Sequence, residues 1–348
     1  MPYKKRKIAV ALSGGIDSAM AAYILKDKGD DIFGLHIKVL PESDDSGDAE
    51  MVADSLGIDL KIIDLSIDFD KNIIIPFCNS YLEGKTPNPC VECNKYIKFG
   101  KLLDEAFKSG ASFIATGHYC IVQEEKKSQR YILKKGIDES KDQSYFLWRL
   151  QQQQLRSVLM PLGTCFKKDI KHQALRYFPF LKDRSDSQEV CFIKGDYRDF
   201  LKEKLGTKKI RRGPILDTRG ALLGWHEGIP FYTIGQRRGL GVSHSEPLYV
   251  KEIDPIKNTV ILGTSDEILK RSLRVTDLSF IAGKPPGDVF DAEAMIRYNS
   301  KGTPATVKIG DEGSATIELK KPQRSVTPGQ SAVLYDNDVL IGGGIIKR

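Results

Sequence analysis

Long apolar runs are absent from the sequence, and none reaches the roughly 18 residues that a membrane-spanning helix needs. The apolar stretch after the basic N-terminus, residues 8–12, is too short for a signal peptide and is not followed by a small-residue cleavage site, so we expect none. Cysteine is also scarce, because six in 348 residues are too few for the disulfide scaffold of a secreted protein. We therefore predict a cytoplasmic protein whose closely spaced cysteines bind a metal or react.

Nothing in the composition indicates disorder, since 41% of the residues are hydrophobic and 28% are charged. We find no internal repeat and no low-complexity tract. A length of 348 residues predicts two or three domains. The net charge of +7 permits an anionic partner such as nucleic acid but does not require one.

Strand and helix patterns alternate over the first part of the chain. Short apolar runs typical of buried strands alternate with amphipathic patterns typical of helices. The expected strands are residues 7–12, 31–40, 60–65 and 112–116, and the expected helices are residues 18–29, 47–56, 70–83 and 94–108. This alternation predicts an α/β domain with a doubly wound, mostly parallel sheet.

The pattern changes after about residue 205, where short alternating runs lie between Gly, Pro and Asp turns. The runs include residues 248–253, 259–262, 305–309, 315–319 and 332–335. Such spacing predicts one or two small β-barrels or sandwiches.

A glycine-rich turn between the first strand and the first helix is the strongest functional signal. It comprises Ala11, Leu12, Ser13, Gly14, Gly15, Ile16, Asp17 and Ser18. The glycines let the backbone approach a ligand, and the helix start offers free N–H groups and the positive end of its dipole to an anion. We interpret the turn as a phosphate-binding loop rather than a plain strand-to-helix connection.

Two common nucleotide-binding patterns are missing. The chain has no G-x-x-x-x-G-K-[ST] and no G-x-G-x-x-G after the first strand, which disfavours Walker-type NTPases and ordinary dinucleotide folds. The sequence Ser-Gly-Gly-x-Asp-Ser instead resembles the PP-loop of ATP pyrophosphatases, which cleave ATP to AMP and pyrophosphate. This resemblance implies ATP as the nucleotide, and Mg²⁺ near Asp17 would neutralise its phosphates.

The cysteines supply a second signal. Cys90 and Cys93 form a Cys-x-x-Cys pair just before a predicted helix, and Cys191 lies in a polar stretch typical of a loop. The pair alone fits half of a zinc site, a redox pair, or two ligands of a cluster. No second Cys-x-x-Cys completes a zinc site, and the usual context of a thioredoxin-like pair is missing. We expect the other cysteines to be packed thiols; these are Cys78, Cys120 and Cys165.

Several multi-residue motifs follow one another in a single order over most of the chain. They are Thr-Pro-Asn-Pro at 86–89, Cys-Asn-Lys at 93–95, Ala-Thr-Gly-His-Tyr at 115–119, Lys-Asp-Gln-Ser-Tyr-Phe-Leu at 141–147, Asp-Ser-Gln-Glu-Val-Cys-Phe at 186–192, Gly-Gln-Arg-Arg-Gly-Leu-Gly at 235–241 and Pro-Gly-Gln-Ser at 328–331. Together they resemble the tRNA-specific 2-thiouridylase family. The resemblance implies a PP-loop adenylation and thiolation domain over residues 1–204, a central domain over 205–270 and a tRNA-binding β-barrel over 271–348.

The function that the resemblance implies is ATP-dependent sulfuration of the wobble uridine of tRNA. In this family the uracil O2 is adenylated, sulfur attacks C2 and AMP leaves. Cys93 matches the nucleophile and Cys191 matches the thiol that carries a persulfide; the expected sulfur donor is a cysteine desulfurase, a relay protein or inorganic sulfide. Ile37 and Gly117 match ATP contacts. The residues that match tRNA contacts are Asn88, Pro89, His118, Lys141, Asp142, Gln143, Arg297, Tyr298 and Gln330.

Cys90 departs from the family, in which many members have Asp at this position. Three thiols, Cys90, Cys93 and Cys191, could bind three irons of a [4Fe–4S] cluster and leave the fourth iron open to sulfide. We favour this cluster over a persulfide relay because of the third thiol alone.

Basic residues gather in three places, as expected for a protein that binds an RNA backbone. The clusters are Lys126, Lys127, Arg130, Lys134 and Lys135, then the stretch 202–212 with six Lys or Arg and one Glu, and finally Arg237 with Arg238. Other functions are open: a thiolase for another tRNA uridine position, a PP-loop ligase with a small-molecule substrate, and a non-catalytic metal-bearing RNA-binding module.

Overall fold

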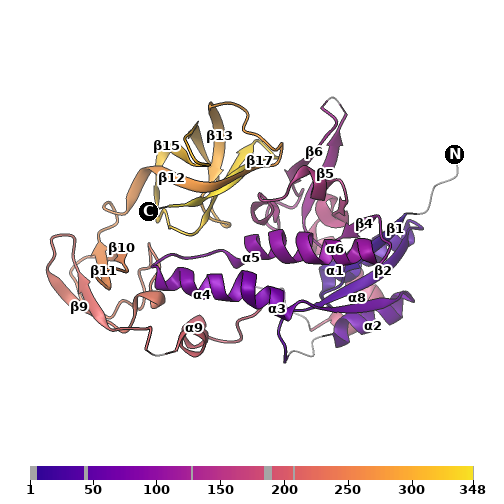
Figure 1. Cartoon of the computed structure of the whole chain (residues 1–348), viewed down its shortest axis with the longest axis horizontal. Helices are drawn as coiled ribbons and strands as arrows, with labels where there is room; N and C mark the ends of the chain where they lie inside the picture. The colour runs from indigo at the N-terminus through magenta and orange to yellow at the C-terminus, as the bar shows by residue number, and fades with distance from the viewer. Residues whose placement is uncertain (1–5, 43–45, 127, 184–189, 207, 348) are drawn as a thin grey trace.

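The computed structural model describes residues 6–42, 46–126, 128–183, 190–206 and 208–347. Figure 1 shows a sheet with helices at one end of the molecule, a small β-structure at the other end, and a barrel above the long helices between them. No helix among these residues is long and apolar enough to cross a membrane.

The first part is built on a five-stranded parallel sheet in the order β3–β2–β1–β4–β7. Its strands are β1 (Lys7–Ala11), β2 (Asp31–Lys38), β3 (Leu60–Asp64), β4 (Phe113–Ala115) and β7 (Val158–Leu159). Ala9 of β1 packs into one hydrophobic core, whereas Ile8 and Val10 pack into another. A strand that is buried on both faces is typical of a parallel sheet with a helical layer on each side. The predicted α/β fold is confirmed.

Helices cover both faces of this sheet. They are α1 (Ile16–Asp27), α2 (Gly47–Leu56), α6 (Leu102–Lys108) and α8 (Lys167–Tyr177). Helices α1, α2 and α8 share a core with Ile8 and Val10, whereas α6 packs on the opposite face of the sheet with Ala9. The short α7 (Gln152–Leu155) precedes β7 at the edge of the sheet.

The two helices expected at 70–83 and 94–108 each combine α- and π-helical segments. The first comprises α3 (Ser66–Phe69), a π-helical turn at Asp70–Ile74 and α4 (Ile75–Leu82). The second comprises α5 (Pro89–Glu92), a π-helical segment at Cys93–Lys101 and α6. Because π-helical turns are rare and often occur at functional sites, the start of the second one at Cys93 marks this residue.

The C-terminal part is a closed barrel, in which β12 pairs with both β15 and β17 and joins the ends of the order β12–β15–β14–β13–β16–β17. Its strands are β12 (Leu269–Phe280), β13 (Val289–Met295), β14 (Thr303–Ile309), β15 (Ala315–Arg324), β16 (Ser331–Asp336) and β17 (Val339–Ile346). Alternate residues such as Ala305 and Val307 fill its core. The predicted barrel is confirmed.

A hairpin from the first part extends the sheet of this barrel. Strands β5 (Cys120–Glu125) and β6 (Arg130–Lys135) pair with each other, and β6 meets β17 where Lys134 faces Val339. Lys134 lies 2.8 Å from a carboxylate oxygen of Asp338, and Lys135 lies 3.2 Å from one of Glu293. Two lysines of the first basic cluster therefore attach the hairpin to the barrel, while Lys127 lies outside the described residues.

The chain between these two parts forms a four-stranded sheet in the order β10–β11–β8–β9, which lies at the opposite end of the molecule from the parallel sheet (Figure 1). Its strands are β8 (Gly213–Leu216), β9 (Leu222–His226), β10 (Tyr249–Asp254) and β11 (Thr259–Gly263), and α9 (Tyr197–Leu205) precedes them. Phe192 contacts Phe77 of α4 and Phe200 of α9, with ring centroids 5.3 and 5.5 Å apart. This aromatic cluster holds the segment after Cys191 against the long helices.

Candidate active site

The glycine-rich turn lies at the carboxyl end of β1 and leads into α1. Gly14 has a φ of +75°, and a Cβ there would lie 2.6 Å from the Cβ of Asp48, so a side chain would clash. The Ser18 hydroxyl donates to the Gly15 carbonyl over 2.9 Å and accepts from the Ser13 N–H over 3.2 Å. Gly15 starts the helix without a capping side chain, so the N–H groups of the first turn are available to an anion.

Asp17, which we expected beside Mg²⁺ or the nucleotide, pairs with a lysine. The Lys167 ammonium lies 2.8 and 2.7 Å from its two carboxylate oxygens, and the Tyr119 hydroxyl donates to one of them over 2.8 Å. Lys167 is the first residue of α8 and is buried. Sequence reasoning missed it, because nothing in the local pattern separates it from the exposed Lys168.

Gly117 and His118 follow β4, the strand beside β1. A Cβ at Gly117 would lie 2.7 Å from the carbonyl carbon of Asp17, so glycine allows this turn to touch α1. The Nδ1 atom of the buried His118 lies 2.8 Å from the Thr116 hydroxyl. Burial, assisted by the charge of Lys98, holds the pKa of His118 well below its usual range, so the imidazole is neutral at pH 7.

The predicted ATP contacts gather at one edge of the parallel sheet. Ile37 is half-buried near the carboxyl end of β2, where it pairs with Ile63 of β3. The turn 11–18 follows β1, and Gly117 follows β4. Carboxyl ends of neighbouring strands form the crevice in which open α/β sheets bind ligands, so the fold brings these residues together, and their contacts with ATP stay predictions.

The three predicted sulfur-site cysteines influence one another electrostatically. Cys90 in α5 and Cys191 are exposed, and Cys93 is half-buried. Burial raises the pKa of Cys93 to about 12; the charge of Lys98 opposes this shift, and the other two thiols add to it. The protein packed around Cys90 likewise raises the pKa of this thiol, and Cys191 raises it further. Such mutual effects require the three sulfur atoms to lie in one region of the molecule.

In the part of the chain that the structure describes, no group of three or more His, Cys, Asp or Glu side chains could hold a metal ion. The [4Fe–4S] cluster on Cys90, Cys93 and Cys191 that we favoured therefore stays a prediction. The Lys167 ammonium contacts both carboxylate oxygens of Asp17 in this structure, and the role of Asp17 in placing Mg²⁺ stays a prediction.

The barrel positions the segment 86–89. The Thr86 N–H donates to the Pro328 carbonyl over 2.9 Å, and the Gln330 amide donates to the Thr86 carbonyl over 2.8 Å. Gly329 has a φ of +92°, and a Cβ there would lie 2.9 Å from the Thr86 carbonyl oxygen. Gln330 thus has a role in docking the loop, which sequence reasoning did not predict, and its contact with tRNA stays a prediction.

Asn88 and Pro89 form the start of α5, directly before Cys90. Asn88 is the last residue before the helix, and Pro89 occupies the first turn, where a missing N–H costs no helical hydrogen bond. Burial raises the pKa of Tyr298 on the barrel, and the charges of Asp142 and Cys90 raise it further. Because Cys90 acts on Tyr298 in this way, the two side chains lie near each other. The structure therefore brings these predicted tRNA contacts together around Cys90.

Other predicted tRNA contacts serve internal hydrogen bonds in this structure. Arg297 donates to the carbonyls of Arg324 and Ser325 over 2.8 and 3.0 Å. Asp142 accepts a hydrogen bond from the Ser144 hydroxyl over 2.7 Å. Burial raises the pKa of Asp142, and the hydrogen bond from Ser144 together with two backbone hydrogen bonds opposes this rise. The Gln143 side-chain oxygen accepts from the Tyr119 N–H over 3.1 Å. Lys141 is half-buried beside them, and contact of any of these residues with tRNA stays a prediction.

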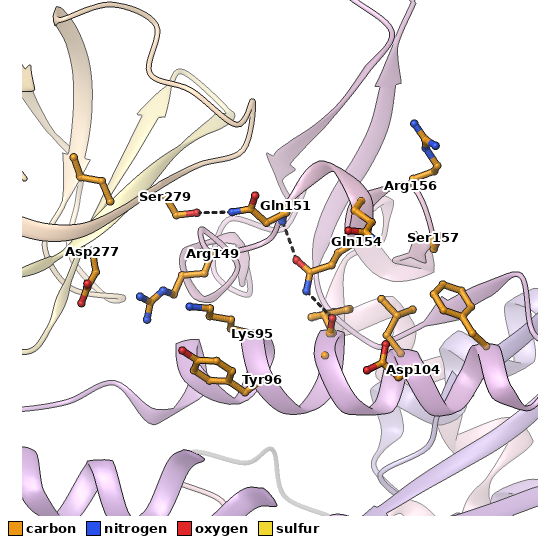
Figure 2. Close-up of a pocket in the computed structure, with 16 residues that line it drawn as sticks. Lys95, Tyr96, Asp104, Arg149, Gln151, Gln154, Arg156, Ser157, Asp277 and Ser279 are labelled. Carbon is orange, nitrogen blue, oxygen red and sulfur yellow. Dashed lines mark hydrogen bonds between the residues drawn. The ribbon is translucent and has the colours of Figure 1, made fainter. Parts of the chain in front are cut away.

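A groove with a volume of ≈ 770 Å³ separates the π-helical segment after Cys93 from β12 of the barrel. Figure 2 shows Lys95 and Tyr96 along the helix wall, with Asp277 and Ser279 on the opposite side. The Lys95 ammonium lies 4.6 Å from the centroid of the Tyr96 ring, which is 39% exposed. An exposed ring beside a cation is typical of sites that stack nucleic-acid bases.

Three family models cover nearly the whole chain. The tRNA methyl transferase HUP domain matches residues 6–195, the tRNA methyl transferase PRC-barrel domain matches residues 198–264, and the aminomethyltransferase beta-barrel domain matches residues 270–346. A HUP domain with this phosphate loop, followed by a PRC-barrel and a β-barrel, defines the class of protein to which the chain belongs.

Named relatives narrow this class to one family. The tRNA-specific 2-thiouridylase MnmA 2 of Thermoanaerobacter sp. (strain X514) is 44% identical and covers 98% of each chain. MnmA of Syntrophomonas wolfei is 43% identical over 98% of this chain and 99% of its own, and MnmA of Clostridioides difficile is 38% identical over 99% of each. The chain belongs to the tRNA-specific 2-thiouridylase family, MnmA.

Proposed function

We propose that this protein is an ATP-dependent tRNA uridine sulfurtransferase that makes 2-thiouridine at the wobble position. The observation that carries the proposal is the 44% identity to a protein named as a tRNA-specific 2-thiouridylase over 98% of both chains. The phosphate loop at the carboxyl end of a parallel sheet supports ATP as the activating substrate. We further propose the domain limits 1–204, 205–270 and 271–348, with Mg²⁺ entering together with ATP and the reaction taking place in the cytoplasm.

The first half of the reaction activates the uracil. The O2 atom attacks the α-phosphorus of ATP, pyrophosphate leaves, and the N3 proton is lost as a C2–N3 double bond forms. The turn 11–18 binds the phosphates through backbone N–H groups, and Lys167 supplies a positive charge beside it. The result is an adenylated oxygen that can leave C2 as AMP.

The second half transfers sulfur. We propose a persulfide on Cys191, which is exposed. The Cys191 thiolate attacks the terminal sulfur of a donor persulfide, such as that of a cysteine desulfurase, and the donor thiol leaves. A [4Fe–4S] cluster on the three cysteines is the alternative carrier. The terminal sulfur attacks C2, the C2–O bond breaks and AMP leaves. Cys93 then attacks the Cys191 sulfur, which releases the 2-thiouracil and leaves a Cys93–Cys191 disulfide for an external dithiol to reduce.

Iron content and the Cys90→Asp variant distinguish the persulfide from the cluster. After anaerobic purification and reconstitution with iron and sulfide, we expect no iron bound in a fixed ratio to the chain. We also expect Cys90→Asp, which introduces the residue of many family members, to thiolate tRNA within about threefold of wild type, and Cys191→Ser to lose activity. About four irons per chain, lost in each of the three cysteine variants, would instead establish the cluster.

The groove next to Cys93 predicts a stacking contact with tRNA. Replacing Tyr96 with alanine removes an exposed ring, so we expect tRNA affinity to fall roughly tenfold, with little change in the thiolation rate at saturating tRNA. The measurement is a binding titration with an anticodon stem-loop RNA. Phe107→Ala is the control, because this ring is 44% exposed at the far end of the same helical wall; equal losses in both variants would contradict a specific stack at Tyr96.

The substrate is tested directly by assaying wild-type protein with ATP, a cysteine desulfurase and tRNA that bears uridine at the wobble position. Detection of 2-thiouridine together with AMP and pyrophosphate supports the proposal. Sulfur at another uridine would identify a different tRNA thiolase. Release of pyrophosphate without tRNA would point to a PP-loop ligase with a small-molecule substrate.

A further inference from the structure

Asn94 is buried directly after Cys93, and one of its polar atoms has no partner in the described part of the chain. The residue is 3% exposed. Its Nδ2 donates to the Phe146 carbonyl over 3.2 Å, whereas its Oδ1 meets no hydrogen-bond donor among the residues that the structure describes. A buried acceptor without a donor typically costs about 1–3 kcal/mol, so such atoms are rare in native proteins and each one needs a specific explanation.

The orientation of this amide is fixed. If the side chain were flipped, its oxygen would face the Phe146 carbonyl oxygen, and two acceptors would repel each other. The hydrogen bond to Phe146 therefore keeps Oδ1, a pure acceptor, as the group without a partner. Any ligand that approaches this atom must present a donor.

Asn94 lies among residues that are predicted to contact the target base. Cys93 precedes it in the chain, and Phe146 belongs to the segment that includes the predicted tRNA contacts 141–143. The Phe146 ring packs against Tyr298 of the barrel, with centroids 4.4 Å apart, and Tyr298 lies near Cys90. Asn94 thus sits where three separate segments with predicted tRNA contacts meet.

We infer that Asn94 is a specificity-determining residue, whose Oδ1 accepts a hydrogen bond from the N3–H of the target uracil. Uracil carries a proton at N3, and cytosine carries a lone pair there, so a fixed acceptor favours uridine and repels cytidine. The same hydrogen bond holds O2, on the adjacent carbon, in a defined orientation for adenylation. This inference rests on the proposed function and concerns how that site selects its base.

The test measures binding of anticodon stem-loop RNAs that carry uridine, cytidine or 3-methyluridine at the wobble position. For wild-type protein we expect about tenfold tighter binding of uridine than of 3-methyluridine, which has no N3 proton. In Asn94→Ala we expect this ratio, and the ratio of uridine to cytidine, each to fall to less than half of its wild-type value. Asn72→Ala is the matched control, because the Asn72 amide also donates to a backbone carbonyl, that of Asp68, over 2.7 Å. We expect the control to keep the wild-type ratios.

Two results would overturn the inference. One is equal binding of uridine and 3-methyluridine by the wild-type protein, which needs no variant and therefore does not depend on the folding of Asn94→Ala. The other is an Asn94→Ala protein with a wild-type melting curve and unchanged ratios. If the wild-type protein forms no 2-thiouridine at all, the proposed function fails; if it forms 2-thiouridine but the ratios are unchanged, only the role of Asn94 fails.

Discussion

Replacing Cys93 with serine is expected to lower the rate of tRNA thiolation by at least about a thousandfold. The serine hydroxyl keeps the size of the side chain but is a far weaker nucleophile than a thiolate at neutral pH. ATP binding and uracil adenylation do not need this sulfur. We therefore expect the variant to release about one equivalent of pyrophosphate per active site in a rapid-quench experiment and then stop.

The pKa of the thiol gives this prediction a second readout. Because burial raises the pKa of Cys93 to about 12, the thiolate is a small fraction of the population at neutral pH. Its amount then rises about tenfold for each unit of pH between about pH 7 and pH 9. Thiolation by the wild-type protein should rise accordingly over this range, whereas pyrophosphate release in a single turnover should not.

Cys78→Ser is the matched control for this experiment. Cys78 is a buried thiol of α4, and burial raises its pKa to about 11, but it belongs to a core of aromatic and aliphatic residues. Its replacement should change neither the thiolation rate nor the pH profile. A Cys93→Ser protein that still thiolates tRNA at a tenth of the wild-type rate would show that another group breaks the persulfide bond.

Much of the first part was predictable from the sequence, because its signals are local. β1 is an uninterrupted apolar run, and α1 follows it after two glycines, so strand, loop and helix can be identified without knowledge of their neighbours. The strands of the barrel were predicted in part for the same reason. Alternating runs at 305–309, 315–319 and 332–335 lie within β14, β15 and β16.

The features that sequence reasoning missed depend on contacts between distant segments. The hairpin β5–β6 reads as a basic, polar stretch, and it attaches to a strand about 200 residues later through Lys134 and Val339. The docking role of Gln330 is visible only once the carbonyl of Thr86 is brought to it. Asn94 has an ordinary side chain in sequence, and its significance comes from an oxygen atom that meets no donor among the residues described by the structure.

Lys167→Met is expected to reduce tRNA-dependent pyrophosphate release by about a hundredfold or more at low ATP concentration. The ammonium neutralises Asp17 at the start of α1, next to the loop that receives a triphosphate. Without it, the carboxylate repels the phosphates, and the positive charge that would stabilise the transition state is lost. Lys168→Met is the control, because Lys168 is exposed and adjacent in the chain, and it should behave as wild type.

The double variant Asp17→Asn, Lys167→Met separates these two effects. If Lys167 acted only by neutralising Asp17, removal of both charges would restore the wild-type rate, because no unpaired carboxylate would face the nucleotide. We expect recovery of less than about tenfold relative to Lys167→Met, because we predict that the lysine also interacts with the phosphates once ATP is bound. The two single variants and the double variant form a double-mutant cycle. The non-additivity of their effects on the rate of pyrophosphate release divides the contribution of Lys167 between its ion pair with Asp17 and its action on ATP. Full recovery in the double variant would assign it to the ion pair alone.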